Sequence, residues 1–120
     1  IQARRRAIWQ TYRDSLQPLA ERGCFELPLH PAHATNNAHM FYLVLPSLER
    51  RTDLIAHLRE QGILAVFHYL SLHNSEFYRD RHDGRALPNC DRFADCLVRL
   101  PFFYELDVNA VIGKLKEAQA

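Results

Sequence analysis

The chain has 120 residues, 48% of them hydrophobic and 24% charged, which is typical of one globular domain and argues against a disordered chain. A net charge of +1 and a pI near 8.0 give no reason to expect nucleic acid or an anionic membrane as a partner. No apolar run approaches the roughly 20 residues that a membrane-spanning helix needs, and the polar, basic first residues are unlike a signal peptide.

The first half of the chain predicts a long helix, a strand and a second helix. Apolar residues recur at helical spacing over residues 2–22, and Gly23 is placed to end that helix. Residues 24–29 suit an edge strand because Pro28 cannot continue a ladder, and residues 30–39 are a loop by composition. The continuous apolar run 40–45 predicts a central strand. A helix then follows, capped by Ser47 or Thr52 and ended by Gly62.

The second half begins with residues 63–69, which predict another buried strand. Residues 40–69 would then form a strand–helix–strand unit in a two-layer α/β arrangement. Residues 70–88 are charged and turn-prone, which indicates a surface loop. A short helix from about Cys90, an extended segment ending near Pro101, and a final helix capped by Asp107 complete the expected order.

The histidines could indicate a metal site, but their spacing does not support one. His30 and His33 have a plausible pair spacing without a nearby cysteine, and His68 and His73 lie five positions apart across a strand-to-loop transition. Neither pair makes a known metal motif, so surface or hydrogen-bonded histidines are the favoured interpretation. His57, between charged neighbours on a helix, is expected to be exposed.

Catalytic residues are equally hard to find. Ser71 and His73 lack a nucleophile elbow, and there is no glycine-rich phosphate-binding motif. The two lysines, Lys114 and Lys116, fall on the terminal helix. A stabilising interaction of their charge with the helix dipole is a better explanation for them than a Schiff base with a cofactor. Taken alone, these residues assemble no active site.

Cysteines and arginines also have simple interpretations. Cys24, Cys90 and Cys96 form no CxxC motif and no secreted disulfide framework, which favours a reducing cytoplasm. The triplet at residues 4–6 is all arginine, and the polar face of a helix is a better explanation for it than a nucleic-acid contact.

Three stretches occur in an order and spacing that resemble a known family. They are "NAHMFYLVLP", "DLIAHLREQGILAVFHYLSLH" and "RLPFFYEL". They resemble the C-terminal domain of the DegT/DnrJ/EryC1/StrS sugar aminotransferases, which are pyridoxal-phosphate enzymes. The resemblance covers essentially all 120 residues. It implies the small C-terminal domain of the fold type I aminotransferases, with a short, mostly antiparallel sheet and helices packed on it.

The resemblance also implies what this chain lacks. In the family, pyridoxal 5'-phosphate, its lysine and its phosphate-binding residues belong to a large N-terminal domain, and the full-length enzymes are homodimers. We therefore expect residues 1–120 to be a single domain of a longer aminotransferase, with no cofactor on this piece and no catalytic residue in it. The start at Ile1 fits that expectation. Surfaces that meet the missing domain would then expose an apolar patch.

Four residues are the substrate-binding candidates that the resemblance suggests. His68, Tyr69 and His73 match the family's HY…H positions, where their donors could bond a diphosphate or sugar hydroxyls, or shape the pocket. Arg99 could meet a phosphate, although a surface arginine at a strand edge is the simpler interpretation. Ser71 occupies the usual proline position, so the loop should be freer than in the family.

One alternative from a different class remains open. The chain could be a free-standing α/β ligand-binding or dimerisation module without catalysis, and the residues alone do not exclude it.

Overall fold

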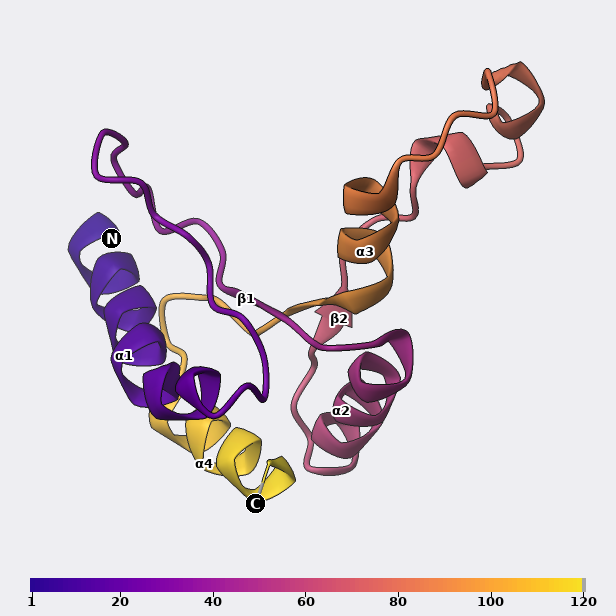
Figure 1. The fold of residues 1–120 in the computed structure, drawn as a ribbon. Helices are drawn as coiled ribbons and strands as arrows, with labels where there is room; N and C mark the ends of the chain where they lie inside the picture. Colours follow the sequence, from indigo (N-terminus) through magenta and orange to yellow (C-terminus); the bar gives the residue numbers. More distant parts are fainter. Residues whose placement is uncertain (120) are drawn as a thin grey trace.

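The computed structural model describes residues 1–119, which form four α-helices around a small sheet (Figure 1). The helices are α1 (Gln2–Glu21), α2 (Leu48–Glu60), α3 (Pro88–Cys96) and α4 (Val108–Ala118), and the strands are β1 (Tyr42–Val44), β2 (Val66–Phe67) and β3 (Leu97–Arg99). Two single-turn 3₁₀ helices, η1 (Leu72–Asn74) and η2 (Arg79–Arg81), lie between β2 and α3. No helix in the described part is long and apolar enough to cross a membrane.

The sheet has the strand order β1–β3–β2, with both pairs antiparallel. Leu43 of β1 and Phe67 of β2 both lie opposite Val98, so β3 runs between them. The fold is therefore α/β with a three-stranded antiparallel sheet, as expected. Residues 40–45 were expected to form a central, covered strand, and β1 is indeed largely buried, with Glu26 bridged to Val44 on the edge away from β3. What the sequence did not indicate is that β3, the last strand in the chain, inserts between β1 and β2.

Two strand predictions need correction. Residues 24–29 form a single bridge, between Glu26 and Val44, rather than an edge strand. Pro28, two positions later, has no N–H group with which to continue the pairing. Residues 63–69 were expected to be a buried strand, yet β2 is two residues long and both are exposed. Successive side chains of a strand point to opposite faces, so neither face of the sheet is fully covered at β2 in this chain. Local sequence could not reveal that exposure.

The core lies between α1, the sheet, α2 and α4. The apolar stripe of α1 is buried as its spacing predicts, at Ile8, Trp9, Tyr12, Leu16 and Leu19. The ring of Tyr12 stacks on Phe41 with centroids 5.0 Å apart, and Trp9 meets the same ring edge-on at 5.4 Å. α4 packs against both α1 and α2. These contacts make one contiguous core that does not depend on residues 70–87.

Helix ends follow the predicted chemistry in two places. The side chain of Ser47 accepts a hydrogen bond from the Arg50 N–H at the start of α2, and that of Asp107 accepts one from Ala110 at the start of α4. Gly62, just after α2, has a φ of +75°, a conformation that glycine adopts without steric cost. His57 was expected to be exposed, but it is half-buried and its Nε2 atom is buried without a hydrogen-bond partner in the described chain.

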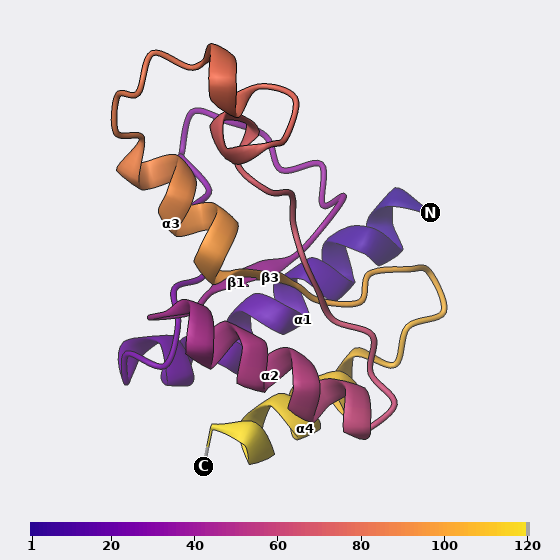
Figure 2. The same cartoon turned by 90° about the vertical axis from the view of Figure 1, so that its right-hand side faces the viewer.

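Residues 70–87 form a lobe that stands away from this core. Figures 1 and 2 both place the lobe, with η1 and η2, beyond α3 at the opposite end of the molecule from α4. No residue from Leu72 to Cys90, a stretch that the structure describes in full, is buried. Apolar burial therefore contributes little to holding the lobe in place.

Candidate functional site

A shallow groove of about 230 Å³ runs between the end of β2 and helix α3. One wall is the segment that follows β2, and the other is the face of α3 that leads into β3. The residues that line it are His68, Tyr69, Leu70, Ser71, Leu72, Cys90, Phe93, Ala94 and Leu97. The groove thus combines imidazole and phenol groups with an apolar floor, a combination suited to a small polar ring compound.

His68 is placed in the groove by the register of the sheet. Val66 lies directly opposite Arg99, and His68, two residues further along, points to the same face as Val66. Arg99 is therefore a diagonal neighbour of His68, and its Nη1 atom lies 3.3 Å from Nδ1 of His68. Because a guanidinium group can only donate, Nδ1 must accept, which leaves Nε2–H as the donor of this imidazole.

Tyr69 is the most open of the four candidates. It is 74% exposed, and its ring lies beside that of His68 with centroids 4.5 Å apart. Side chains at successive positions of an extended segment point to different sides, so the two rings meet only because the chain leaves the sheet here. Tyr69 is free to meet a ligand or another protein surface.

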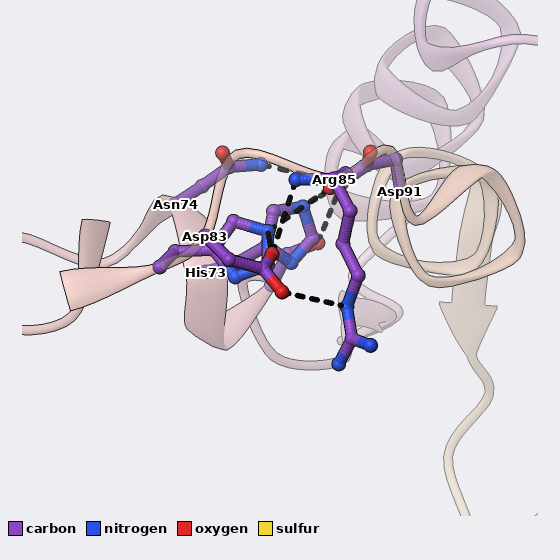
Figure 3. Close-up of polar contacts among 7 residues, drawn as sticks. His73, Asn74, Asp83, Arg85 and Asp91 are labelled. Atoms are coloured by element: carbon purple, nitrogen blue, oxygen red, sulfur yellow. Dashed lines mark hydrogen bonds and ion pairs between the residues drawn. The ribbon is translucent and has the colours of Figure 1, made fainter. Parts of the chain in front are cut away.

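His73 lies apart from the other three candidates. It belongs to η1 and its side chain is 10% exposed, with Nε2 2.8 Å from Oδ1 of Asp91 at the start of α3 (Figure 3). Its ring also lies 5.2 Å from the ring of His82, centroid to centroid. The structure therefore brings His68, Tyr69 and Arg99 together, whereas His73 contacts Asp91 and is not among the residues that line the groove.

Ser71, which stands where the family has proline and so led us to expect a freer loop, lies at the start of η1. Its φ of −60° is the value that proline would impose. It is 6% exposed, and its Oγ donates a hydrogen bond of 3.1 Å to Oδ1 of Asp91. The side-chain hydrogen bond thus joins the segment that follows β2 to helix α3.

Helix α3 is itself tied to the body of the protein. Arg92 hydrogen-bonds Glu26, the residue that bridges to β1, and this bond raises the pKa of the Arg92 guanidinium. Arg51 of α2 donates to the carbonyl of Ala94 at 3.1 Å. Both contacts join α3 to residues outside the lobe, so the α3 side of the groove is held by the body of the protein. The segment 68–75, on the other side of the groove, has neither of these contacts.

Neither of the two lysines of this chain lies beside the groove. Lys114 pairs with Glu117 at 2.9 Å on the exposed side of α4, and Lys116 is exposed on the same helix, at the far end from the groove (Figure 2). Neither lysine could form a Schiff base beside His68. A metal ion fits no better, because the described residues contain no group of three or more His, Cys, Asp or Glu side chains arranged to hold one.

A larger hollow of about 440 Å³ lies between α1 and the loop near His30. Arg6, Trp9 and Thr35 are among the residues that line it. It contains none of the four sequence candidates, and Trp9 is only 8% exposed there. We therefore place the candidate site in the groove beside α3.

Sequence reasoning missed two residues that shape this site. Asp91 was not singled out in the sequence, because nothing local pointed to its partners in η1. Phe93 contributed to the sequence prediction only as a sign of a short helix, and the structure shows it 41% exposed and lining the groove. Only the folded chain shows that the loop returns to meet them.

Comparison with known proteins identifies a family and a fold. The sequence profile of the DegT/DnrJ/EryC1/StrS aminotransferase family matches residues 1–116. Among solved structures, the aminotransferase TlmJ from Streptoalloteichus hindustanus superposes with a TM-score of 0.84 at 25% identity, over 98% of this chain and 31% of that chain. DesV from S. venezuelae gives 0.85 at 27% identity, over 98% of this chain and 32% of that chain.

A third structure shares the fold at lower identity. It is the PLP form of a putative sugar aminotransferase from Streptococcus pneumoniae, with a TM-score of 0.83 and 21% identity over 99% of this chain and 31% of that chain. The 120-residue chain therefore spans about a third of the length of the solved structures that it resembles.

Proposed function

The chain belongs to the DegT/DnrJ/EryC1/StrS aminotransferase family, and from this membership we propose that residues 1–120 are the C-terminal domain of a longer sugar aminotransferase. The observation that carries the proposal is the match over residues 1–116 together with a coverage of 31% of TlmJ. The remainder of the parent enzyme would include a large N-terminal domain that holds pyridoxal 5'-phosphate and its lysine. The parent would act as a homodimer in the cytoplasm, where the three free cysteines stay reduced.

The proposed reaction moves an amino group from glutamate to a keto sugar carried by a nucleotide. The stretches "NAHMFY", "AVFHY" and "RLPFFY" favour dTDP-4-amino-4,6-dideoxygalactose transaminase, which acts on a dTDP-4-keto-6-deoxyhexose in the synthesis of lipopolysaccharide and enterobacterial common antigen. No residue of this chain is proposed as catalytic, because its lysines do not fit the cofactor. On its own the chain would not transaminate.

The groove beside α3 would supply contacts to the sugar nucleotide. His68 offers an Nε2–H donor, Tyr69 offers a phenol, and Arg99 both orients His68 and brings positive charge near a diphosphate. His73 would belong to the same substrate-binding surface by shaping it from behind. The apolar side chains of Leu70 and Phe93 would pack against the sugar ring or the base.

Titration with thymidine diphosphate glucose, followed by NMR, tests this proposal. We expect shifts at His68, Tyr69 and Arg99, and a Kd on the order of millimolar because half of the pocket would be missing. Tyr69→Phe should weaken binding severalfold, whereas Tyr104→Phe, a change at another exposed tyrosine, should leave it unchanged. Thymidine diphosphate alone separates recognition of the nucleotide from that of the sugar.

The competing hypothesis is a non-catalytic α/β ligand-binding or dimerisation module. It predicts shifts centred on another surface, such as the hollow near His30, or no response of the groove to the sugar nucleotide. Either result would replace the proposal with the module hypothesis.

A further inference from the structure

The lobe at residues 70–87 lacks an apolar anchor, although it carries one wall of the groove. Within the described stretch from Leu72 to Cys90, every residue is exposed or half-buried. Large apolar side chains such as Leu72 and Phe77 are 67% and 73% exposed. The position of this wall must therefore depend mainly on polar contacts.

One carboxylate oxygen collects most of these contacts. Oδ1 of Asp91 lies 2.8 Å from Nε2 of His73, 3.1 Å from Oγ of Ser71 and 3.2 Å from Nδ2 of Asn74. Figure 3 shows the side chains of His73 and Asn74 converging with that of Asp91, from η1 on one side and α3 on the other. All three groups donate, and an ionised carboxylate is the side chain best suited to accept several donors.

Asp91 also lies between the two walls of the groove. Its neighbour Cys90 and Phe93, two residues further along α3, line one wall. Its partner Ser71 lies in the other wall, directly after Tyr69 and Leu70. The bond between Asp91 and Ser71 thus joins the walls and sets the distance between them.

We propose that Asp91 is the positioning residue of the groove: it gathers Ser71, His73 and Asn74 on α3 and so fixes where His68 and Tyr69 stand. This inference rests on the proposed function for the identity of the ligand, but not for the anchoring itself. In this proposal His73 helps to hold the loop on α3, because its Nε2–H donates a hydrogen bond to the Asp91 carboxylate. A second cluster, in which Nε2 of His82 lies 3.0 Å from the Arg85 carbonyl, orders the tip of the lobe without joining it to α3.

The test compares Asp91→Asn with Asp95→Asn on the 120-residue chain, whose own core is complete in the structure. Asp95 lies on the same helix, is exposed, and its side chain makes no hydrogen bond or ion pair within the described chain, so it is a matched control. Hydrogen exchange of amides 71–75 should rise about tenfold in Asp91→Asn and stay unchanged in Asp95→Asn. Amides of α1 and α4 should keep their protection in both. Ser71→Ala, which removes one donor, should give a smaller rise.

NMR of the His73 side chain distinguishes a specific positioning role of Asp91 from a general loss of order in the loop. In the wild type, side-chain ¹⁵N shifts of His73 should report a ring protonated at Nε2, and Asp91→Asn should abolish that state and move the signals of His68 and Tyr69. Asp91→Glu should restore part of both. If exchange and the His73 signature in Asp91→Asn match the control, or if the His68 and Tyr69 signals stay in place, the proposal is wrong.

Binding distinguishes the two proposals from each other. If the wild type binds thymidine diphosphate glucose and Asp91→Asn binds it equally tightly, the positioning role fails while the proposed function stands. If the wild type shows no binding but Asp91→Asn displaces His68 and Tyr69, the proposed function fails while the positioning role stands.

Discussion

The hydroxyl group of Tyr12 is the polar end of a fully buried ring. The ring is 0% exposed, and the hydroxyl donates a hydrogen bond of 3.0 Å to the carbonyl of Pro101, which follows β3. Burial penalises the charged form, so the pKa of Tyr12 is raised above its ordinary value. At the scale of a residue, one hydrogen bond thus ties α1 to the segment that leaves the sheet, and the burial of the same side chain makes stability depend on pH.

We predict that the stability of the wild type falls in alkali because of Tyr12. The unfolded chain releases the tyrosine proton near pH 10.0 while the folded chain retains it, so the free energy of unfolding decreases above that pH by about 1.4 kcal/mol for each pH unit. Tyr12→Phe should cost about 1 kcal/mol at neutral pH and lack this part of the alkaline decrease. Urea unfolding from pH 7 to 11 measures both effects, with Tyr104→Phe as the exposed control. Parallel pH profiles for wild type and Tyr12→Phe would contradict the prediction.

Helix α1 is fixed at its first turns by arginine side chains as well as by its apolar stripe. Arg4 donates to the carbonyls of Tyr104 and Leu106, and Arg5 donates to those of Ala38 and His39 at 3.1 Å each. Arg5 also lies over the ring of Phe102. The basic triplet is thus largely a set of helix-to-loop contacts, which explains its place on a polar helix face without any nucleic-acid partner.

We predict that neighbouring arginines of α1 differ in their contribution to stability. Arg5→Gln should lower the free energy of unfolding by about 1 kcal/mol, because it removes charge-assisted bonds that are only partly screened by solvent. Arg6→Gln, at an exposed position one residue later, should change it by less than about 0.5 kcal/mol. Thermal and urea unfolding of the two variants would measure the difference. Equal effects would mean that the contacts of Arg5 contribute no net stability.

At the scale of the whole molecule, several large apolar side chains around the groove and in the lobe are exposed to solvent. The exposed fractions are 41–75% for Phe67, Tyr69, Leu70, Leu72, Phe77 and Phe93. These side chains lie on β2, in the segment that follows it, in the lobe and on α3. The sequence led us to expect an exposed apolar patch where a missing domain would pack, and we place that predicted patch here.

We predict that the isolated chain self-associates through this surface. Its apparent mass in analytical ultracentrifugation should exceed 14.0 kDa and rise with concentration. The double variant Leu70→Gln, Leu72→Gln should shift it toward the monomer, whereas Leu29→Gln, at a side chain 90% exposed in another loop, should not. A wild-type chain that stays monomeric at every concentration would show that the exposed surface alone does not drive association.

Several features of the fold could be read from the sequence because they depend on neighbours along the chain. The stripe from Ile8 to Leu19, the cap at Ser47, the turn at Gly62 and the cap at Asp107 are local, and the structure confirms each. The strand order was not readable, because pairing of Leu43 and Phe67 with Val98 joins segments far apart in sequence. Local reasoning therefore predicted a covered first strand, which the burial of β1 bears out, and a buried second strand, which was wrong.

The amino-acid sequence by itself determined the α/β class, the helices and their caps, the family, and the candidates His68, Tyr69, His73 and Arg99, since propensity, periodicity and motif spacing all reside in the chain order. Only the tertiary structure decided how those candidates are arranged. Sheet register placed Arg99 against His68, and the returning lobe placed His73 and Ser71 on Asp91. These contacts depend on where a loop folds back in space, and no local pattern encodes that position.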